Sequence, residues 1–255
     1  MTLLELRRSR DRGYDDHGWL RTYYTFCFAD YYDPEHVDFG ALKVMNEERI
    51  KPGKGYPSQA RSDAEVLTYL IEGELRHQDS LGNDVVVRAG TLQCLSAGTG
   101  LSYTETNTSA SQEAHLLHIC IKPAKDGLTP GYEQKYFAAG EKRGTLRLLA
   151  SPDGQSGSVL VHQDARLYCG LFNETERKEL ELDKNRRAFI HVARGSIAIN
   201  ETRLNAGDGV KVSAGGAIIL QHGRDAEVIV FDVPAGPPPP KRKSTPRLKS
   251  KSTAK

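Results

Sequence analysis

The segment 53–73 reads GKGYPSQARSDAEVLTYLIEG, and it decides the fold. Its second half contains Leu67-Thr68-Tyr69-Leu70-Ile71, an apolar stretch whose β-branched and aromatic side chains favour a β-strand. Similar short stretches recur along the chain at residues 85–87, 116–121, 189–192, 197–199, 218–220 and 228–233. Turn residues separate them, and the only helix signal is a turn or so at 132–137. Short strands with frequent turns predict an all-β sandwich or barrel.

The chain also contains an internal repeat. Gly90 is followed six residues later by Ser96-Ala97-Gly98, and Gly207 is followed six residues later by Ser213-Ala214-Gly215. Both copies lie between turns and after a glycine-bearing strand pair, which indicates a duplicated unit. Because a closed barrel leaves no sheet edge unpaired, two barrels account for the length. We predict an N-terminal barrel over residues 1–130, a C-terminal barrel over 131–234 and a disordered tail over 235–255.

The composition predicts an ordinary cytoplasmic globular protein, with 38% hydrophobic and 27% charged residues. No apolar run approaches the roughly 18–20 residues of a membrane helix, and the N-terminus lacks the apolar core of a secretory signal. The cysteines are Cys27, Cys94, Cys120 and Cys169. Because no two lie close in sequence and three lie in apolar stretches, we expect buried free thiols and no disulfide framework.

The C-terminal tail differs in kind from the rest of the chain. After four prolines at 237–240, its basic residues are Lys241, Arg242, Lys243, Arg247, Lys249, Lys251 and Lys255, with no acidic residue among them. Such a segment cannot bury enough apolar surface to fold alone, so we predict disorder. Its charge predicts an electrostatic contact with nucleic acid or an acidic protein. The alternative is a solubilising appendage with no dedicated partner.

The opening segment matches the first signature of the cupin fold, G-x5-H-x-H-x3-E followed by a later glycine. The matching residues are Gly53, Gln59, Arg61, Glu65 and Gly73. A second cupin signature follows over residues 90–107. In this pattern histidines would stand at positions 59, 61 and 103. Histidines at i and i+2 project from the same face of a strand, so both can reach one ion inside a barrel.

Short sequence motifs show that the chain resembles the pirin family in particular, over about residues 7–234. The stretches that carry it are HGWL (17–20), TFCFADYYDP (25–34), EVLTY (65–69), HQDSLGN (77–83), SAGTG (96–100) and VHQD (161–164). The resemblance implies two cupin barrels, the first of which holds iron or a similar ion with three histidines and a glutamate. It further implies either quercetin 2,3-dioxygenase activity or redox-linked transcriptional coregulation, because pirins include both.

Carried over by position, the pirin ligands fall on Gln59, Arg61, Tyr103 and Glu105, and only Glu105 is retained. Glutamine offers a weak neutral oxygen, and tyrosine binds metal only when its phenol, with a pKa of about 10, is deprotonated. Arginine has no lone pair to give and keeps its charge. We therefore predict a degenerate metal site and no cofactor. Any cofactor that did bind would be a divalent metal such as iron.

We further expect Arg61 and Glu105 to form an ion pair where the metal would lie, because a buried carboxylate without a cation needs a partner or a proton. The candidate ligand pocket comprises Gln59, Arg61, Glu65, Tyr103 and Glu105, and no catalytic residue is assigned. His115 and His118 are three apart and should face opposite sides of a strand. Neither these nor His77 and His162 show ligand spacing with Glu105.

Three functions remain open at this point. The first is a pirin-like protein without dioxygenase activity that binds a small aromatic ligand or regulates a partner. The second is a quercetin 2,3-dioxygenase-like enzyme that holds metal through Glu105 and unexpected ligands. The third is a nucleic-acid-associated regulator that acts through the basic tail.

Overall fold

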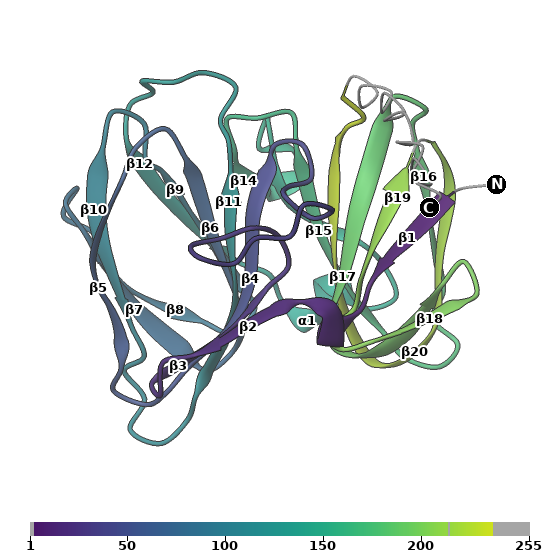
Figure 1. Ribbon diagram of the computed structural model, residues 1–255, viewed down its shortest axis with the longest axis horizontal. Coiled ribbons are helices and arrows are strands. Elements are labelled where there is room, and N and C mark those ends of the chain that lie inside the picture. Colours follow the sequence, from purple (N-terminus) through teal and green to yellow (C-terminus); the bar gives the residue numbers. More distant parts are fainter. Residues whose placement is uncertain (1–2, 214, 237–255) are drawn as a thin grey trace, which may run out of the picture.

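A computed structural model describes residues 3–213 and 215–236, and it shows two β-barrels side by side (Figure 1). The strands are short and separated by tight turns, as their alternating and apolar sequences require. The predicted all-β fold with two barrels is confirmed. No helix in the described ranges is long and apolar enough to cross a membrane. The basic tail from Lys241 onwards lies outside the described residues.

The first barrel is built from two sheets. One has the strand order β12-β9-β6-β11-β4-β3-β2 and the other β5-β10-β7-β8. The bounds are β2 Gly13–Asp16, β3 Leu20–Tyr24, β4 Leu42–Ile50, β5 Gly55–Arg61, β6 Glu65–Glu72, β7 Glu74–Asp79, β8 Asp84–Arg88, β9 Thr91–Ser96, β10 Leu101–Thr106, β11 Ala114–Ile121 and β12 Gly131–Tyr136.

The second barrel is one sheet whose main path is β1-β19-β17-β20-β15-β13-β14, with β16 paired to β20 and β18 to β17. The strand bounds are β1 Leu3–Arg7, β13 Arg147–Ser151, β14 Val159–Leu160, β15 Arg166–Phe172, β16 Lys178–Leu182, β17 Arg186–Ile199, β18 Thr202–Asn205, β19 Gly209–Ser213 and β20 Gly216–Pro234. Helical turns are limited to α1 Ala139–Lys142 and the 3-10 turns η1 Ser9–Asp11 and η2 Gln155–Gly157 within the described ranges.

Two strands cross the predicted barrel boundaries. β1 comes from the N-terminus but pairs with β19 of the second barrel, in the register Leu3 to Ser213. β12 follows residue 130 but pairs with β9 of the first barrel. The helical turn expected at 132–137 is therefore wrong, because these residues complete the free edge of β9. Edge pairing of this kind joins distant segments, so a division by position along the chain misses it.

The repeat occupies equivalent places in the two barrels. Gly90 and Gly207 precede β9 and β19, with φ of 86° and 83°. Gly73 and Gly195 lie in the preceding strand pairs with φ of 79° and 66°. These left-handed conformations favour glycine, which explains why this residue recurs at matched positions.

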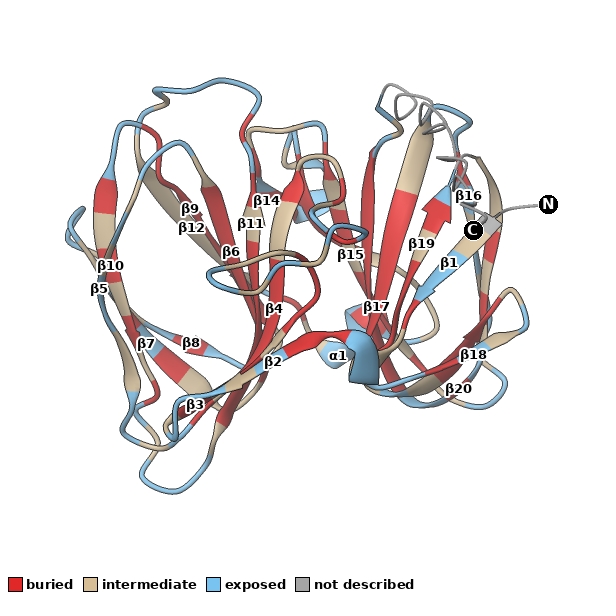
Figure 2. Ribbon diagram, viewed as in Figure 1, coloured by how far each residue is buried: buried red, intermediate tan, exposed pale blue. Residues whose placement is uncertain are grey.

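The largest apolar core lies between the barrels, where β4, β6 and β11 face β15, β17 and β20. Figure 2 shows these strands mostly as buried. Met45, Leu67 and Leu117 from the first barrel belong to the same buried cluster as Phe189 and Phe231 from the second. One apolar core therefore joins the two barrels.

A buried polar cluster centred on Glu47 also crosses this interface. Glu47 accepts hydrogen bonds from Arg12 Nη2 at 2.8 Å and pairs with His115 Nε2 at 3.0 Å. His191 of β17 lies 3.6 Å away. Burial opposes the charge, but His115, His191 and Arg12 together hold the pKa of Glu47 well below its usual value. His115 therefore serves the contact between the barrels, on the opposite side of β11 from His118, as the spacing predicts.

Candidate functional site

The four positions expected to carry metal ligands lie together on β5 and β10 of the first barrel. Tyr103 stands opposite Gln59, and Leu101 stands opposite Arg61, in this antiparallel pair. Tyr103 and Glu105 are buried, whereas Gln59 and Arg61 are half-buried at the rim. The sequence motif thus places these residues side by side, as its spacing predicts.

A β-bulge in β5 changes what faces Glu105. The register slips between Tyr103 and Glu105, so that Glu105 stands opposite Tyr56. The extra residue falls at Pro57-Ser58, which both point outward. β5 is an edge strand, where proline and bulges are tolerated. The bulge turns Tyr56 toward the interior of the first barrel, which the periodicity of the sequence does not reveal.

Glu105 is held by neutral donors. Its Oε1 accepts hydrogen bonds from Thr68 Oγ1 at 3.3 Å and from Gln93 Nε2. His77 Nδ1 lies 4.0 Å from the same oxygen. The side chain is only 1% exposed. Burial raises the pKa of Glu105 to about 7, although the bonds from Thr68 and Gln93 oppose the shift. In neutral solution a large share of this group is therefore the uncharged acid.

The expected ion pair between Arg61 and Glu105 is wrong. Arg61 Nη2 donates instead to Gln59 Oε1 at 2.6 Å, and Nη1 donates to the Ala60 carbonyl at 3.1 Å. No ion pair of Arg61 occurs within the described ranges. The physical reason is depth, because a half-buried guanidinium keeps its hydration at the rim while Glu105 lies deeper. Proton uptake at Glu105 costs less than burying a second charge.

Three further polar residues, not predicted from the sequence, face the interior of the first barrel together with Tyr56, His77, Tyr103 and Glu105. These seven residues form the polar layer of the barrel. Asn46 and Glu48 of β4 and His118 of β11 share one face, because Asn46 pairs with His118 and Glu48 with Leu116. All are nearly inaccessible to solvent. The signal that could have found them is the run Asn46-Glu47-Glu48, polar residues on both faces of an otherwise apolar strand.

This polar layer is incompletely paired. Within the described ranges, buried atoms without a hydrogen-bond partner include Glu48 Oε2, Tyr103 Oη, His118 Nδ1, His77 Nδ1 and both amide atoms of Asn46. Most buried polar atoms in proteins are paired, so these atoms are free to bond to water or to a polar ligand, and Glu48 is the one among them that lines a described cavity.

Burial also fixes the ionisation of the layer. It raises the pKa of Glu48 to about 8, with Tyr56 opposing the shift and Glu105 adding to it. Burial, followed by the charge of Arg61, lowers the pKa of His118 to about 4. Burial and the nearby Glu105 raise the pKa of the Tyr103 phenol far above its usual range. At neutral pH Glu48 and His118 are therefore mostly uncharged, Glu105 is about half ionised, and Tyr103 keeps its phenolic proton.

Glu65 does not join this site. It lies at the start of β6, on the face turned toward the second barrel, and is fully buried. Its Oε2 accepts from Ser96 Oγ at 3.0 Å, and its Oε1 lies 3.3 Å from His162 Nδ1. The expected pocket therefore loses Glu65, because odd-numbered residues of β6 face away from Thr68 and Glu105.

These donors do not fit a divalent metal ion. The Gln59 Oε1 atom accepts a hydrogen bond from Arg61, and the Tyr103 phenol keeps its proton, so neither side chain supplies an anionic ligand. Across residues 3–213 and 215–236, no group of three or more His, Cys, Asp or Glu side chains has an arrangement that could hold a metal ion. The layer is suited to hydrogen bonding with a polar guest.

Comparison with known proteins places the chain among its relatives. Residues 5–121 match the sequence profile of pirin, and residues 148–233 match that of the quercetinase C-terminal cupin domain. The quercetin 2,3-dioxygenase of Escherichia coli strain K12 is 40% identical over 232 residues, which is 91% of this chain and 99% of the relative. A pirin-like protein of Caulobacter vibrioides is 35% identical over 85% of this chain and 94% of its own.

Solved structures agree with these matches. The bacterial pirin YhhW from Escherichia coli, in complex with nickel(II), superimposes with a TM-score of 0.86 at 40% identity. The match covers 91% of this chain and 99% of that chain.

Proposed function

This chain belongs to the pirin family, and from that premise we propose that it has lost metal-dependent dioxygenase activity and acts as a small-molecule-binding or regulatory protein. The first barrel is the binding domain in this proposal. No cofactor is required, because the function rests on the polar layer of the barrel and not on an ion.

The observation that carries this proposal is the contact between Arg61 and Gln59. Two positions where the cupin pattern has histidines hold a guanidinium and an amide that bond to each other at 2.6 Å. A fixed positive charge at this place repels a divalent cation, and the guanidinium has no lone pair with which to bind it. The hydrogen bonds that Glu105 accepts from Thr68 and Gln93 support the same conclusion, because its Oε1 is already paired with neutral donors.

The competing candidate is a quercetin 2,3-dioxygenase-like enzyme with atypical ligands. It is favoured by the names of the relatives and by the unpaired buried atoms around Glu105. Glu48 and Glu105 are the carboxyl groups that such an enzyme would use. Regulation through the basic tail remains a prediction from the sequence.

An oxygen-uptake assay with quercetin separates these candidates. We expect no uptake above a protein-free blank when the protein is supplied with iron(II), nickel(II) or manganese(II). The reason is that Arg61 excludes the ion needed to activate the reaction. The 40% identical relative from Escherichia coli, assayed in parallel, is the positive control. Metal-dependent uptake that disappears in Glu105→Ala would establish the enzyme and overturn the proposal.

A further inference from the structure

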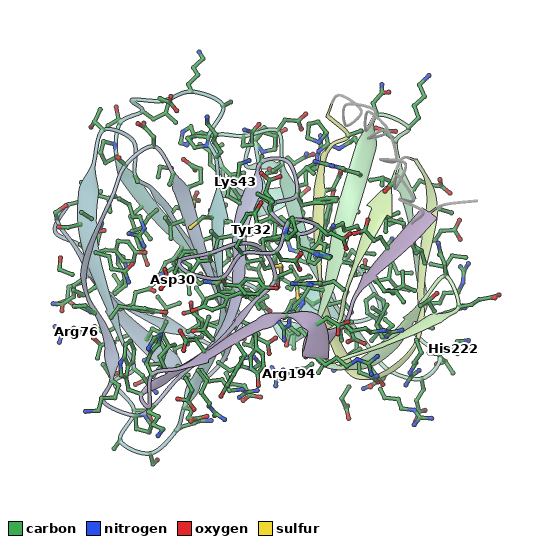
Figure 3. All side chains as sticks on the ribbon, viewed as in Figure 1. Asp30, Tyr32, Lys43, Arg76, Arg194 and His222 are labelled. Carbon is green, nitrogen blue, oxygen red and sulfur yellow. The ribbon has the colours of Figure 1, made fainter. Side chains whose placement is uncertain are left out.

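A cavity opens at the side of the first barrel, between β3 and the edge strand β5, with a volume of about 490 Å3. Its walls are largely aromatic. Tyr24 of β3, Phe28 and Tyr31 of the following loop, and Tyr56 of β5 all line it. Figure 3 labels Asp30, which lies on that loop over the first barrel and also lines the cavity. None of the expected metal-ligand positions contributes to this lining.

The aromatic wall is held in place by its surroundings. Tyr24 stacks on Tyr31 with ring centroids 5.8 Å apart, and Phe28 lies at the same distance from Tyr24. The Tyr31 hydroxyl accepts a hydrogen bond from Arg7 Nη2 at 2.7 Å. Gly13 lets the Tyr31 ring lie close, because a Cβ atom at that position would stand 2.5 Å from it. The wall is thus preorganised, which reduces the entropic cost of binding.

Glu48 lies at the inner end of the cavity. It is only 2% exposed, yet it lines the cavity, and its Oε2 has no hydrogen-bond partner among the described residues. Asp15 and Asp30 line the same cavity nearer the surface, together with His17, which lies 3.2 Å from Asp15. Neither lysine nor arginine is among the lining residues. One unpaired carboxyl oxygen therefore lies behind aromatic rings and an acidic rim.

We propose that this cavity binds a small organic ammonium ion, whose N–H group donates to Glu48 and whose apolar body lies against Tyr24, Phe28 and Tyr31. The aromatic walls suit the apolar body of such a guest, and the acidic rim favours positive over negative guests. The unpaired Oε2 calls for a donor, which a primary ammonium has and a quaternary ammonium lacks. This inference rests on the proposed small-molecule-binding function and names the chemical class of the ligand.

Burial supports the choice of a cation. The pKa of Glu48 is raised to about 8 because its carboxylate is desolvated and lies near Glu105. At neutral pH this carboxyl is mostly protonated in the free protein, and an ammonium group at Oε2 favours its ionised form, so that the proton is released on binding. A phenolate or carboxylate guest would instead add a further negative charge.

Isothermal titration calorimetry of the full chain with 2-phenylethylamine at neutral pH tests the proposal. We expect the amine to bind and the neutral isostere 2-phenylethanol to bind about ten- to a hundredfold more weakly, the usual value of a charge-assisted hydrogen bond. Glu48→Gln should weaken the amine by a similar factor. Glu181→Gln, which changes an exposed glutamate on β16 of the second barrel, should leave it unchanged.

Three outcomes would overturn the inference: no binding of the amine, equal binding of the alcohol, or unchanged affinity in a folded Glu48→Gln variant. The comparison of amine with alcohol needs no variant, so a folding defect in Glu48→Gln leaves the test intact. The outcome is also separable from that of the proposed function. If the protein oxidises quercetin and still binds the amine, only the proposed loss of dioxygenase activity is overturned. If the protein is inactive and does not bind the amine, only the inference of an ammonium site is overturned.

Discussion

Replacing Gln59, Arg61 and Tyr103 together with histidine is expected to convert the first barrel into a metal-binding site. The change removes the guanidinium charge and supplies three imidazole ligands on the strand pair that already carries Glu105. A cation near Glu105 also favours its ionised form, so ligand and metal reinforce each other. The nickel content of the protein after dialysis against nickel(II) should rise from near zero in the native chain to about one ion per chain in the variant.

The control for this experiment is the same triple variant with Glu105→Ala. It should lose most of the gained metal, since only one anionic ligand is present in the set. The single change Arg61→His should gain little, because the Gln59 amide and the protonated Tyr103 phenol remain. A folded triple variant that binds no metal would show that the barrel has diverged beyond its ligand positions.

Glu105→Gln is expected to stabilise the protein at alkaline pH. In the folded chain the pKa of Glu105 is about 7, raised from 4.5. Below about pH 4.5 both states are protonated and the group costs nothing. Between about pH 4.5 and about pH 7 the unfolded chain releases its proton while the folded chain keeps it, so the free energy of unfolding falls by about 3 kcal/mol across this range and changes little above it. Glutamine cannot ionise, and it keeps the bonds from Thr68 and Gln93.

Urea unfolding at about pH 4 and about pH 8 measures this difference. The variant should gain about 3 kcal/mol over the native protein between the two conditions. Glu48 ionises in the same direction, and removal of the Glu105 charge lowers its pKa, which adds to the gain expected for the variant. Glu181→Gln is the matched control, because its side chain is exposed on β16. A variant less stable than the native protein at about pH 8 would indicate that Glu105 holds a cation instead.

The fold was predictable because its signals are local. Strand periodicity, turn glycines and the repeat of Gly90 and Gly207 each depend on neighbouring residues, and the structure places them as expected. The positions of Gln59, Arg61, Tyr103 and Glu105 follow from motif spacing in the same way. β1 and β12 were misassigned because strand pairing across the sheet edges joins segments far apart in sequence.

The chemistry of the site was less predictable, because it depends on depth and on distant strands. The spacing of Arg61 and Glu105 does not show that one side chain stays at the rim while the other is buried. Glu48 lies on a strand that carries no cupin signature, yet it faces both Glu105 and the aromatic cavity. A bulge at Pro57-Ser58 turns Tyr56 inward, and a bulge has no fixed sequence pattern.

The metal content of the native protein decides whether the first barrel holds an ion. The protein would be purified from medium supplemented with iron, nickel and manganese and measured by mass spectrometry of the elements. We expect well under a tenth of an ion per chain, with no difference between the native protein and Glu105→Ala, because the donors around Glu105 do not form a metal site. Near-stoichiometric metal that is lost in Glu105→Ala would contradict it.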